Sequence, residues 1–227
     1  LVRLGQAGVD FSISPAQFTA SRIVGAVLAL SVAGLGIGQA LVLGCHEGYP
    51  GHHVLNALLE EKLTKQKGWV EFSVYPLFSP QSLIAEGSAN YGIGLAFPGG
   101  EKLKFERETL YPLAGLDPAG AEAYDALMRA RADLASSENT IADAYLSGKM
   151  DKQAAIAALA KYGLSSVARA EKRLSFIETY RSYVINYNLG QDMVRAHVER
   201  AGPGQDARWK AMAAVISEPT TPADLAR

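Results

Sequence analysis

The sequence contains almost no cysteine and no excess of charge of either sign. A single cysteine among 227 residues, Cys45, excludes a framework of intramolecular disulfides. Lysine and arginine number 22 against 23 aspartate and glutamate residues, so the net charge is −1. A chain without a basic excess lacks the electrostatic surface that binds nucleic acid or an anionic membrane. We therefore expect no nucleic-acid partner.

One run of the chain lacks charge altogether, from Ile23 to Cys45. Its length would be enough to cross a bilayer, but it contains glycines at positions 34, 36 and 38 and no basic cluster at its C-terminal end. We expect two buried helices broken at residues 34–38 rather than a membrane span; a membrane-associated helical module is the alternative. Because the chain begins at Leu1 and not at Met, we expect a processed protein or the C-terminal part of a longer one.

Histidine is also scarce, and three of the four histidines lie within eight residues. Residues 45–53 read C-H-E-G-Y-P-G-H-H. Histidine is the commonest protein ligand of zinc, and a glutamate beside a ligand histidine can act as general base on a metal-bound water. The usual form of such a site is H-E-x-x-H on one helix. Here the second histidine is displaced to position 52 or 53, and a proline and a glycine precede it.

This displacement requires a distorted helix if the histidines are to bind one ion. On a straight helix His52 would point about 120° away from His46, and His53 would lie about 10 Å further along the axis. A proline removes one helical hydrogen bond and a glycine permits unusual backbone angles, so a kink could bring His52 beside His46. We predict His46 and His52 as metal ligands, Glu47 as general base, and His53 outside the ligand set, where it could contact substrate. The alternative is a hydrogen-bonded polar cluster at a helix junction.

A third ligand is expected from residues 79–91, which read S-P-Q-S-L-I-A-E-G-S-A-N-Y. The initial serine and proline suit the start of a helix. Glu86 is the only charged residue between Pro80 and Phe97, and a lone carboxylate on a buried helix is unfavourable unless it is paired or binds a metal. We predict Glu86 as the third ligand, with Asn90 one turn later holding a ligand histidine by its second ring nitrogen. The alternative is an ion pair between Glu86 and a distant arginine or lysine.

The two motifs together resemble domain-of-unknown-function family 885, bacterial proteins regarded as zinc peptidases. That family has an H-E-x-x-P-G-H motif and a downstream E-G-x-A helix, often in the form E-G-W-A-L-Y, in which Ser88 here replaces the tryptophan. The resemblance implies an α-helical metallohydrolase with His46, His52 and Glu86 on zinc and Glu47 as base. It extends from about residue 14 to the C-terminus, although family members are commonly longer than this chain.

A C-terminal stretch could complete the site. Residues 180–187 read Y-R-S-Y-V-I-N-Y, and their three tyrosines fall near one helical face. Attack of water on a carbonyl creates an oxyanion that needs a hydrogen-bond donor, for which Tyr183 and Tyr187 are candidates. Arg181 could bind a substrate carboxylate. The alternative is an aromatic core stripe with a surface arginine.

Composition and pattern predict a mainly α fold. Apolar residues make up 48% and charged residues 20% of the chain, as is typical of globular proteins, and we expect one α-helical metallohydrolase-like domain over residues 1–227. At most one short extended segment is expected, near residues 69–78. A long helix is predicted from Asp117 to about Leu146, and a helix break at Gly190.

The predicted function is a zinc-dependent hydrolase, a metallopeptidase that acts on a peptide or small amide substrate through a metal-activated water. Two imidazoles and a carboxylate suit Zn²⁺ and also other divalent metals. The rival interpretation is a catalytically inactive, peptidase-like binding protein. The composition is compatible with the cytoplasm and with export to the bacterial envelope, and no repeat or heptad pattern predicts an oligomeric state.

Overall fold

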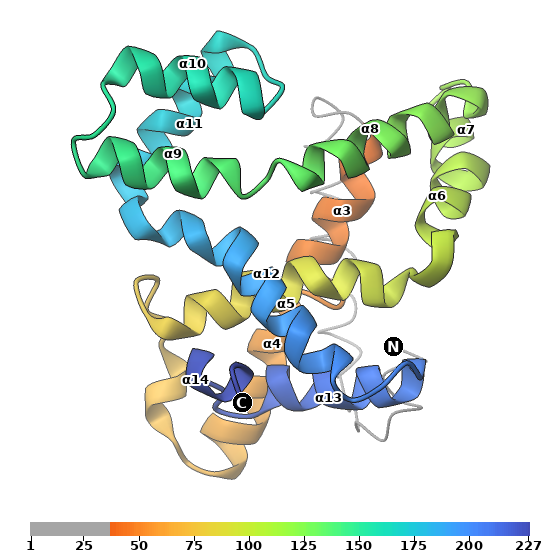
Figure 1. Ribbon diagram of the computed structural model, residues 1–227. Helices are drawn as coiled ribbons and strands as arrows, with labels where there is room; N and C mark the ends of the chain where they lie inside the picture. The colour runs from red at the N-terminus through yellow and green to blue at the C-terminus, as the bar shows by residue number, and fades with distance from the viewer. Residues whose placement is uncertain (1–36) are drawn as a thin grey trace.

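The computed structural model describes residues 37–227, and these residues form helices and no strand (Figure 1). The mainly α prediction is therefore confirmed. The longer helices are α3 (Ile37–Glu47), α4 (His52–Leu59), α5 (Pro80–Ala96), α8 (Ala121–Asp133), α9 (Ser137–Leu146), α10 (Lys152–Tyr162), α11 (Val167–Tyr180), α12 (Ile185–Glu199) and α13 (Gln205–Ser217). The shorter ones are α6 (Glu101–Phe105), α7 (Tyr111–Leu113) and α14 (Pro222–Leu225), with π-helical turns at Glu60–Gln66 and Glu106–Leu110 and 3₁₀ turns at Val70–Ser73, Pro98–Gly100, Pro118–Gly120 and Arg181–Val184.

The crossing of α5 and α12 lies at the centre of the structure (Figure 1). The two helices approach closely because Gly87 on α5 faces Gly190 on α12. A Cβ atom on Gly87 would lie 2.4 Å from the carbonyl carbon and oxygen of Gly190, a distance that no side chain tolerates. Gly190, expected to divide two helices, instead lies within α12 and permits this crossing. The crossing brings residues 86–90 of α5 opposite the start of α12.

Two hydrophobic clusters stabilise the arrangement. The larger one joins α4, α5, α12 and α13, and its fully buried members include Val54, Val194, Val198, Met212 and Ile216. The smaller one joins α9, α10 and α11 around Leu174 and Ile177. Each fully buried aliphatic side chain contributes about 1.5–3 kcal/mol. The larger cluster thus fixes the helices that carry the two sequence motifs.

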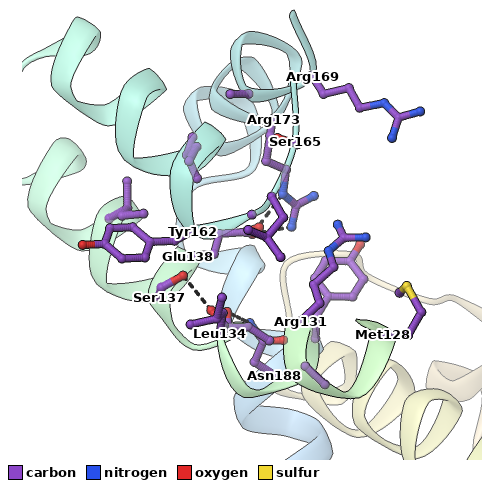
Figure 2. Close-up of a pocket in the computed structure, with 18 residues that line it drawn as sticks. Met128, Arg131, Leu134, Ser137, Glu138, Tyr162, Ser165, Arg169, Arg173 and Asn188 are labelled. Carbon is purple, nitrogen blue, oxygen red and sulfur yellow. Dashed lines mark hydrogen bonds and ion pairs between the residues drawn. The ribbon is translucent and has the colours of Figure 1, made fainter. Parts of the chain in front are cut away.

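A pocket of about 540 Å³ lies beside the smaller cluster. It is bounded by the α8–α9 junction, the α10–α11 connection and the first turn of α12, and Figure 2 shows its side chains. Tyr187 and Asn188 form the wall on the side of α12.

The extended segment expected near residues 69–78 is not a strand. It begins with the 3₁₀ turn Val70–Ser73, in which the Ser73 hydroxyl donates to the Val70 carbonyl at 2.6 Å. The described residues include no neighbouring strand that could hydrogen-bond with it, and Pro76 has no N–H to donate. The weak alternation in this segment therefore does not reflect a sheet.

Two predicted helix boundaries are also wrong. The long helix expected from Asp117 to Leu146 is interrupted between α8 and α9, where Asn188 donates to the Ala135 carbonyl at 2.9 Å and compensates for the lost helical bond. The later break occurs at Arg181 (φ 51°), between α11 and α12.

The uncharged run from Ile23 to Cys45, and the glycines at its centre, lie mostly outside the described residues. Its described end belongs to α3. Within residues 37–227, no helix is both long and apolar enough to cross a bilayer.

Candidate metal centre

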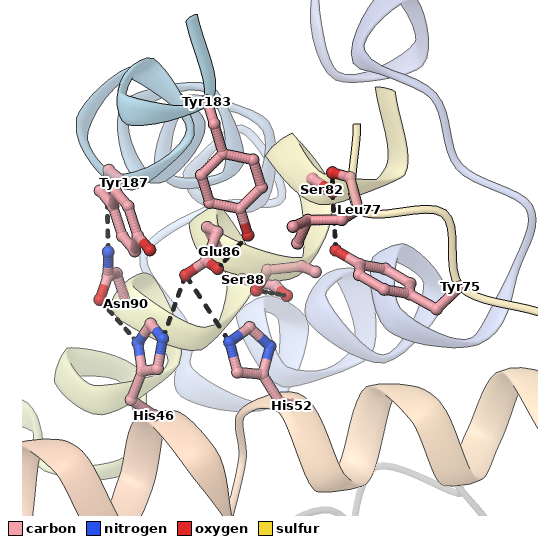
Figure 3. A network of polar contacts seen from close by, with 11 residues as sticks. His46, His52, Tyr75, Leu77, Ser82, Glu86, Ser88, Asn90, Tyr183 and Tyr187 are labelled. Carbon is pink, nitrogen blue, oxygen red and sulfur yellow. Dashed lines mark hydrogen bonds and ion pairs between the residues drawn. The ribbon is translucent and has the colours of Figure 1, made fainter. Parts of the chain in front are cut away.

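The two histidines of the first motif meet at a turn between helices. His46 lies in the last turn of α3, and His52 is the first residue of α4. Their ring centroids are 4.6 Å apart with the planes at 87°. The connecting turn contains a cis peptide bond between Tyr49 and Pro50. The predicted kink therefore brings the two imidazoles side by side (Figure 3).

A glycine is required at position 51 because the turn leaves no room for a Cβ atom, and not because of a positive φ. Its φ is −80°, but a Cβ atom would lie 1.8 Å from the His46 carbonyl oxygen. The Gly51 N–H donates to the Cys45 carbonyl at 3.0 Å, which satisfies one of the carbonyls left without a partner at the end of α3. The turn folds back tightly on α3, and this return places His52 beside His46.

Glu86 reaches the same point from α5. Its side chain is buried, with 5% of the residue exposed. Its Oε2 atom lies 3.1 Å from His46 Nε2 and 3.6 Å from His52 Nε2. Figure 3 shows the carboxylate pointing between the two rings. Three residues predicted as metal ligands, from three helices, thus converge on one point.

Asn90 fixes the orientation of the His46 ring. Its side-chain amide donates from Nδ2 to the Tyr187 carbonyl at 3.0 Å, so that its Oδ1 faces His46 Nδ1 at 2.9 Å. An amide oxygen only accepts hydrogen bonds, so Nδ1 carries the ring proton. In neutral His46 the Nε2 lone pair then points at the Glu86 carboxylate. Two electron pairs face each other, and this contact is favourable only with a cation, a proton or a metal, between them.

The contact between His46 and Glu86 shifts their pKa values in opposite directions. Burial alone would lower the pKa of His46, but the hydrogen bond and charge of Glu86 outweigh it and raise that pKa above its usual value. Burial would raise the pKa of Glu86, but hydrogen bonds from His46, His52 and Tyr183 lower it to about 2. The raised pKa of His46 favours a proton on Nε2 beside the Glu86 carboxylate, and a metal that binds at this nitrogen would displace that proton.

The donor set fits a divalent cation. The ligand atoms of His46, Glu47 and His52 lie within 4.8 Å of one another, and Glu86 Oε2 is buried without a well-formed hydrogen bond. Two carboxylates therefore stand beside the two imidazoles. Glu86 differs from Glu47 in that it is buried and one of its oxygens faces both rings. Glu47, half-buried and next in sequence to His46, remains available for proton transfer.

The two candidate tyrosines occupy different positions. The buried Tyr183 hydroxyl donates to Glu86 Oε1 at 2.7 Å and orients the carboxylate. Its proton is therefore already used in a hydrogen bond within the protein. The Tyr187 hydroxyl makes no hydrogen bond within the described part of the chain. Burial and the charge of Glu86 raise the pKa of Tyr187 to about 12, so its hydroxyl stays protonated at neutral pH. Tyr187 is therefore the better placed hydrogen-bond donor.

His53 and Arg181 lie outside this cluster. The His53 ring packs against Tyr49, with centroids 5.4 Å apart, and its Nε2 is buried without a partner. Arg181 is exposed at the turn between α11 and α12. The structure therefore gives neither residue a contact with the converging ligand atoms.

Sequence analysis missed the role of Tyr183 as a partner of Glu86 and missed the arginines near Tyr187. Arg173 lies 5.7 Å from the Tyr187 ring centroid and pairs with Glu138. These contacts join helices far apart in sequence and leave no local motif. The basic residues at positions 169, 172 and 173 of α11 were the signal available in the sequence.

Replacement of Asn90 by leucine is expected to weaken zinc binding by about 10–100-fold, because His46 would lose the bond that fixes its ring and tautomer. The dissociation constant can be measured by competition with a chromophoric chelator. Gln81→Leu, on the same helix but without a contact to the histidines, is the control and should bind zinc as the wild type does. Equal affinity of Asn90→Leu and wild type would contradict the assigned role.

We compared the chain with known proteins. No family model, no curated protein and no solved structure matches it.

Proposed function

We propose that the chain is a zinc-dependent hydrolase of peptide or amide bonds, as its two motifs and their likeness to family 885 suggest. The observation that carries the proposal is the convergence of Glu86 Oε2 on the Nε2 atoms of His46 and His52, at 3.1 and 3.6 Å. Catalytic zinc sites usually have three protein ligands and one open position. Two imidazoles and one carboxylate are a ligand set of catalytic zinc in known peptidases, and other divalent ions accept the same set.

The neighbouring residues suit hydrolysis. A bound Zn²⁺ supplies the Lewis acidity that makes a water molecule nucleophilic at neutral pH. Glu47, within 4.8 Å of the ligand atoms, would accept the proton of that water and pass it to the leaving amine. Tyr187 would donate a hydrogen bond to the carbonyl oxygen as negative charge develops there. Tyr183 and Asn90 hold Glu86 and His46 in place.

Zinc content and chelator-sensitive hydrolysis test the proposal together. After dialysis against zinc and then against metal-free buffer, we expect about one zinc ion per chain by elemental mass spectrometry, and much less in His52→Ala. Incubation with a peptide mixture should give cleavage that a chelator stops and added zinc restores. A wild-type chain that retains no zinc would refute the proposal. A chain that retains zinc but cleaves no peptide would be the catalytically inactive binding protein.

A further inference from the structure

A cluster of arginines lines the pocket beside the candidate metal centre. Arg131 comes from α8, and Arg169 and Arg173 come from α11. In Figure 2 the guanidinium groups of Arg131 and Arg173 lie near each other, and the Arg169 side chain extends outward at the rim. Three positive charges face a single carboxylate in the lining, that of Glu138.

Most of this positive charge is uncompensated. Glu138 accepts hydrogen bonds from Arg173, from Nε at 2.9 Å and also from the terminal nitrogen. Within residues 37–227, neither Arg131 nor Arg169 takes part in an ion pair. Arg131 and Arg169 are therefore left to attract an anion from solution.

Tyr187 lies between the pocket and the candidate metal centre. The Tyr187 side chain lines the pocket, and its ring centroid is 5.9 Å from that of Tyr183, which binds Glu86. Its backbone carbonyl accepts from Asn90, which holds His46. Tyr187 is thus the residue that lines the pocket and also contacts residues that hold the candidate ligands.

The size and lining of the pocket favour part of a peptide over a small inorganic anion. A volume of about 540 Å³ falls within the range of about 300–1,000 Å³ that is typical of sites for organic ligands. Besides the arginines the lining contains apolar side chains, among them Leu134, Ile141 and Leu159. Guanidinium groups bind carboxylates in a planar, two-point geometry.

We propose that this pocket binds a carboxylate of the substrate, so that the enzyme prefers peptides with a negative charge near the scissile bond. The inference rests on the proposed peptidase function. It assigns to Arg131 and Arg169 the role that the sequence suggested for Arg181. The carboxylate could be the free C-terminus of a peptide or an acidic side chain.

Calorimetric titration of the zinc-loaded Glu47→Gln variant tests this preference without turnover. The probes are N-acetylated tetrapeptides that end in glutamate, glutamine or alanine, each with a free or an amidated C-terminus. We expect peptides with a carboxylate to bind about tenfold more tightly than the neutral ones, as expected of one charge-assisted hydrogen-bonded pair near the surface. The free C-terminus and the side chain are separated by comparing the free alanine peptide with the amidated glutamate peptide.

The same titration with the additional substitutions Arg131→Gln and Arg169→Gln should reduce the preference to less than about twofold, because the uncompensated charges are gone. Arg129→Gln is the matched control: it lies on the same helix, is exposed and pairs with Asp125, but does not line the pocket. The inference is overturned if charged and neutral peptides bind equally, or if Arg129→Gln abolishes the preference as well.

Wild-type hydrolysis distinguishes the failure of this inference from that of the proposed function. If zinc-dependent cleavage has the same KM for neutral and charged peptides, the proposed carboxylate binding is refuted and the proposed hydrolase function stands. If binding shows a charge preference that depends on Arg131 and Arg169 but no peptide is cleaved, the carboxylate-binding pocket is supported and the proposed hydrolase function is refuted.

Discussion

Replacement of Glu47 by glutamine is expected to lower kcat for peptide hydrolysis by about 10²–10⁴-fold, the usual contribution of a positioned general base. Glutamine keeps the size of the side chain but cannot accept a proton at neutral pH. Since Glu47 is half-buried at the end of α3, the substitution should leave the fold intact.

The zinc content of this variant decides between two roles for Glu47. Its carboxylate lies within 4.8 Å of the His46 and His52 ligand atoms, so it could be a ligand rather than a base. If Glu86 is the third ligand, Glu47→Gln should bind zinc as tightly as the wild type does, and Glu86→Gln should lose it.

Elemental analysis gives the zinc content of the two variants, and kinetics with a single peptide substrate give their kcat. If Glu47→Gln loses zinc and Glu86→Gln retains it, Glu47 is the third ligand and Glu86 is not. Unchanged hydrolysis in Glu47→Gln would show that a different group accepts the proton. Circular dichroism confirms that each variant is folded, so that an inactive but unfolded protein is not misread.

Replacement of Gly51 by alanine is the second change with a large expected effect. The added Cβ would lie 1.8 Å from the His46 carbonyl oxygen and 2.6 Å from that of Cys45, and both are backbone atoms at the end of a helix. Relief requires α4 to move away from α3, which separates His52 from His46. We expect a loss of about 1–3 kcal/mol or more in the free energy of unfolding. Zinc affinity should fall by at least about 100-fold, because even an outer-shell partner contributes about 10–100-fold.

Denaturant unfolding and zinc competition measure these two effects, and Gly44→Ala is the matched control. Gly44 lies two residues before His46 on the same helix and is exposed, and a Cβ there would contact none of the described residues 37–227 within 4 Å. Alanine at this position should stabilise the helix by up to about 1 kcal/mol and leave zinc binding unchanged. Normal zinc affinity in Gly51→Ala would show that the turn tolerates a different path and that the close return of the chain does not assemble the site.

Much of the candidate site could be inferred from the sequence because its signals are local. A proline and a glycine between two histidines predict a kink whatever surrounds them, since the missing N–H and the missing Cβ act on adjacent backbone. Glu86, alone in an uncharged helix, is conspicuous for the same reason: an unpaired carboxylate in a buried segment needs a partner. Asn90 follows one helical turn later. The structure brings these side chains together in the expected neighbourhood.

The division of roles between the tyrosines was decided by tertiary structure. Tyr183 and Tyr187 look equivalent in the sequence, one helical turn apart. The 3₁₀ turn at Arg181–Val184 places the Tyr183 hydroxyl on Glu86, across 97 residues of sequence, while the Tyr187 hydroxyl has no hydrogen bond to any residue in the range 37–227. Helix periodicity carries no information about such a contact, because the contact depends on how two separate helices cross.

The sequence by itself thus determined the helical class and the set of residues able to hold a metal, since propensity, turn chemistry and the cost of a buried charge act over a few neighbouring residues. Only the tertiary structure decided which atoms meet. The Gly87–Gly190 crossing holds α12 against α5, where Tyr183 reaches Glu86, and the interruption before α9 forms part of the arginine-lined pocket. Both depend on the packing of whole helices, a property that no single stretch of the chain encodes.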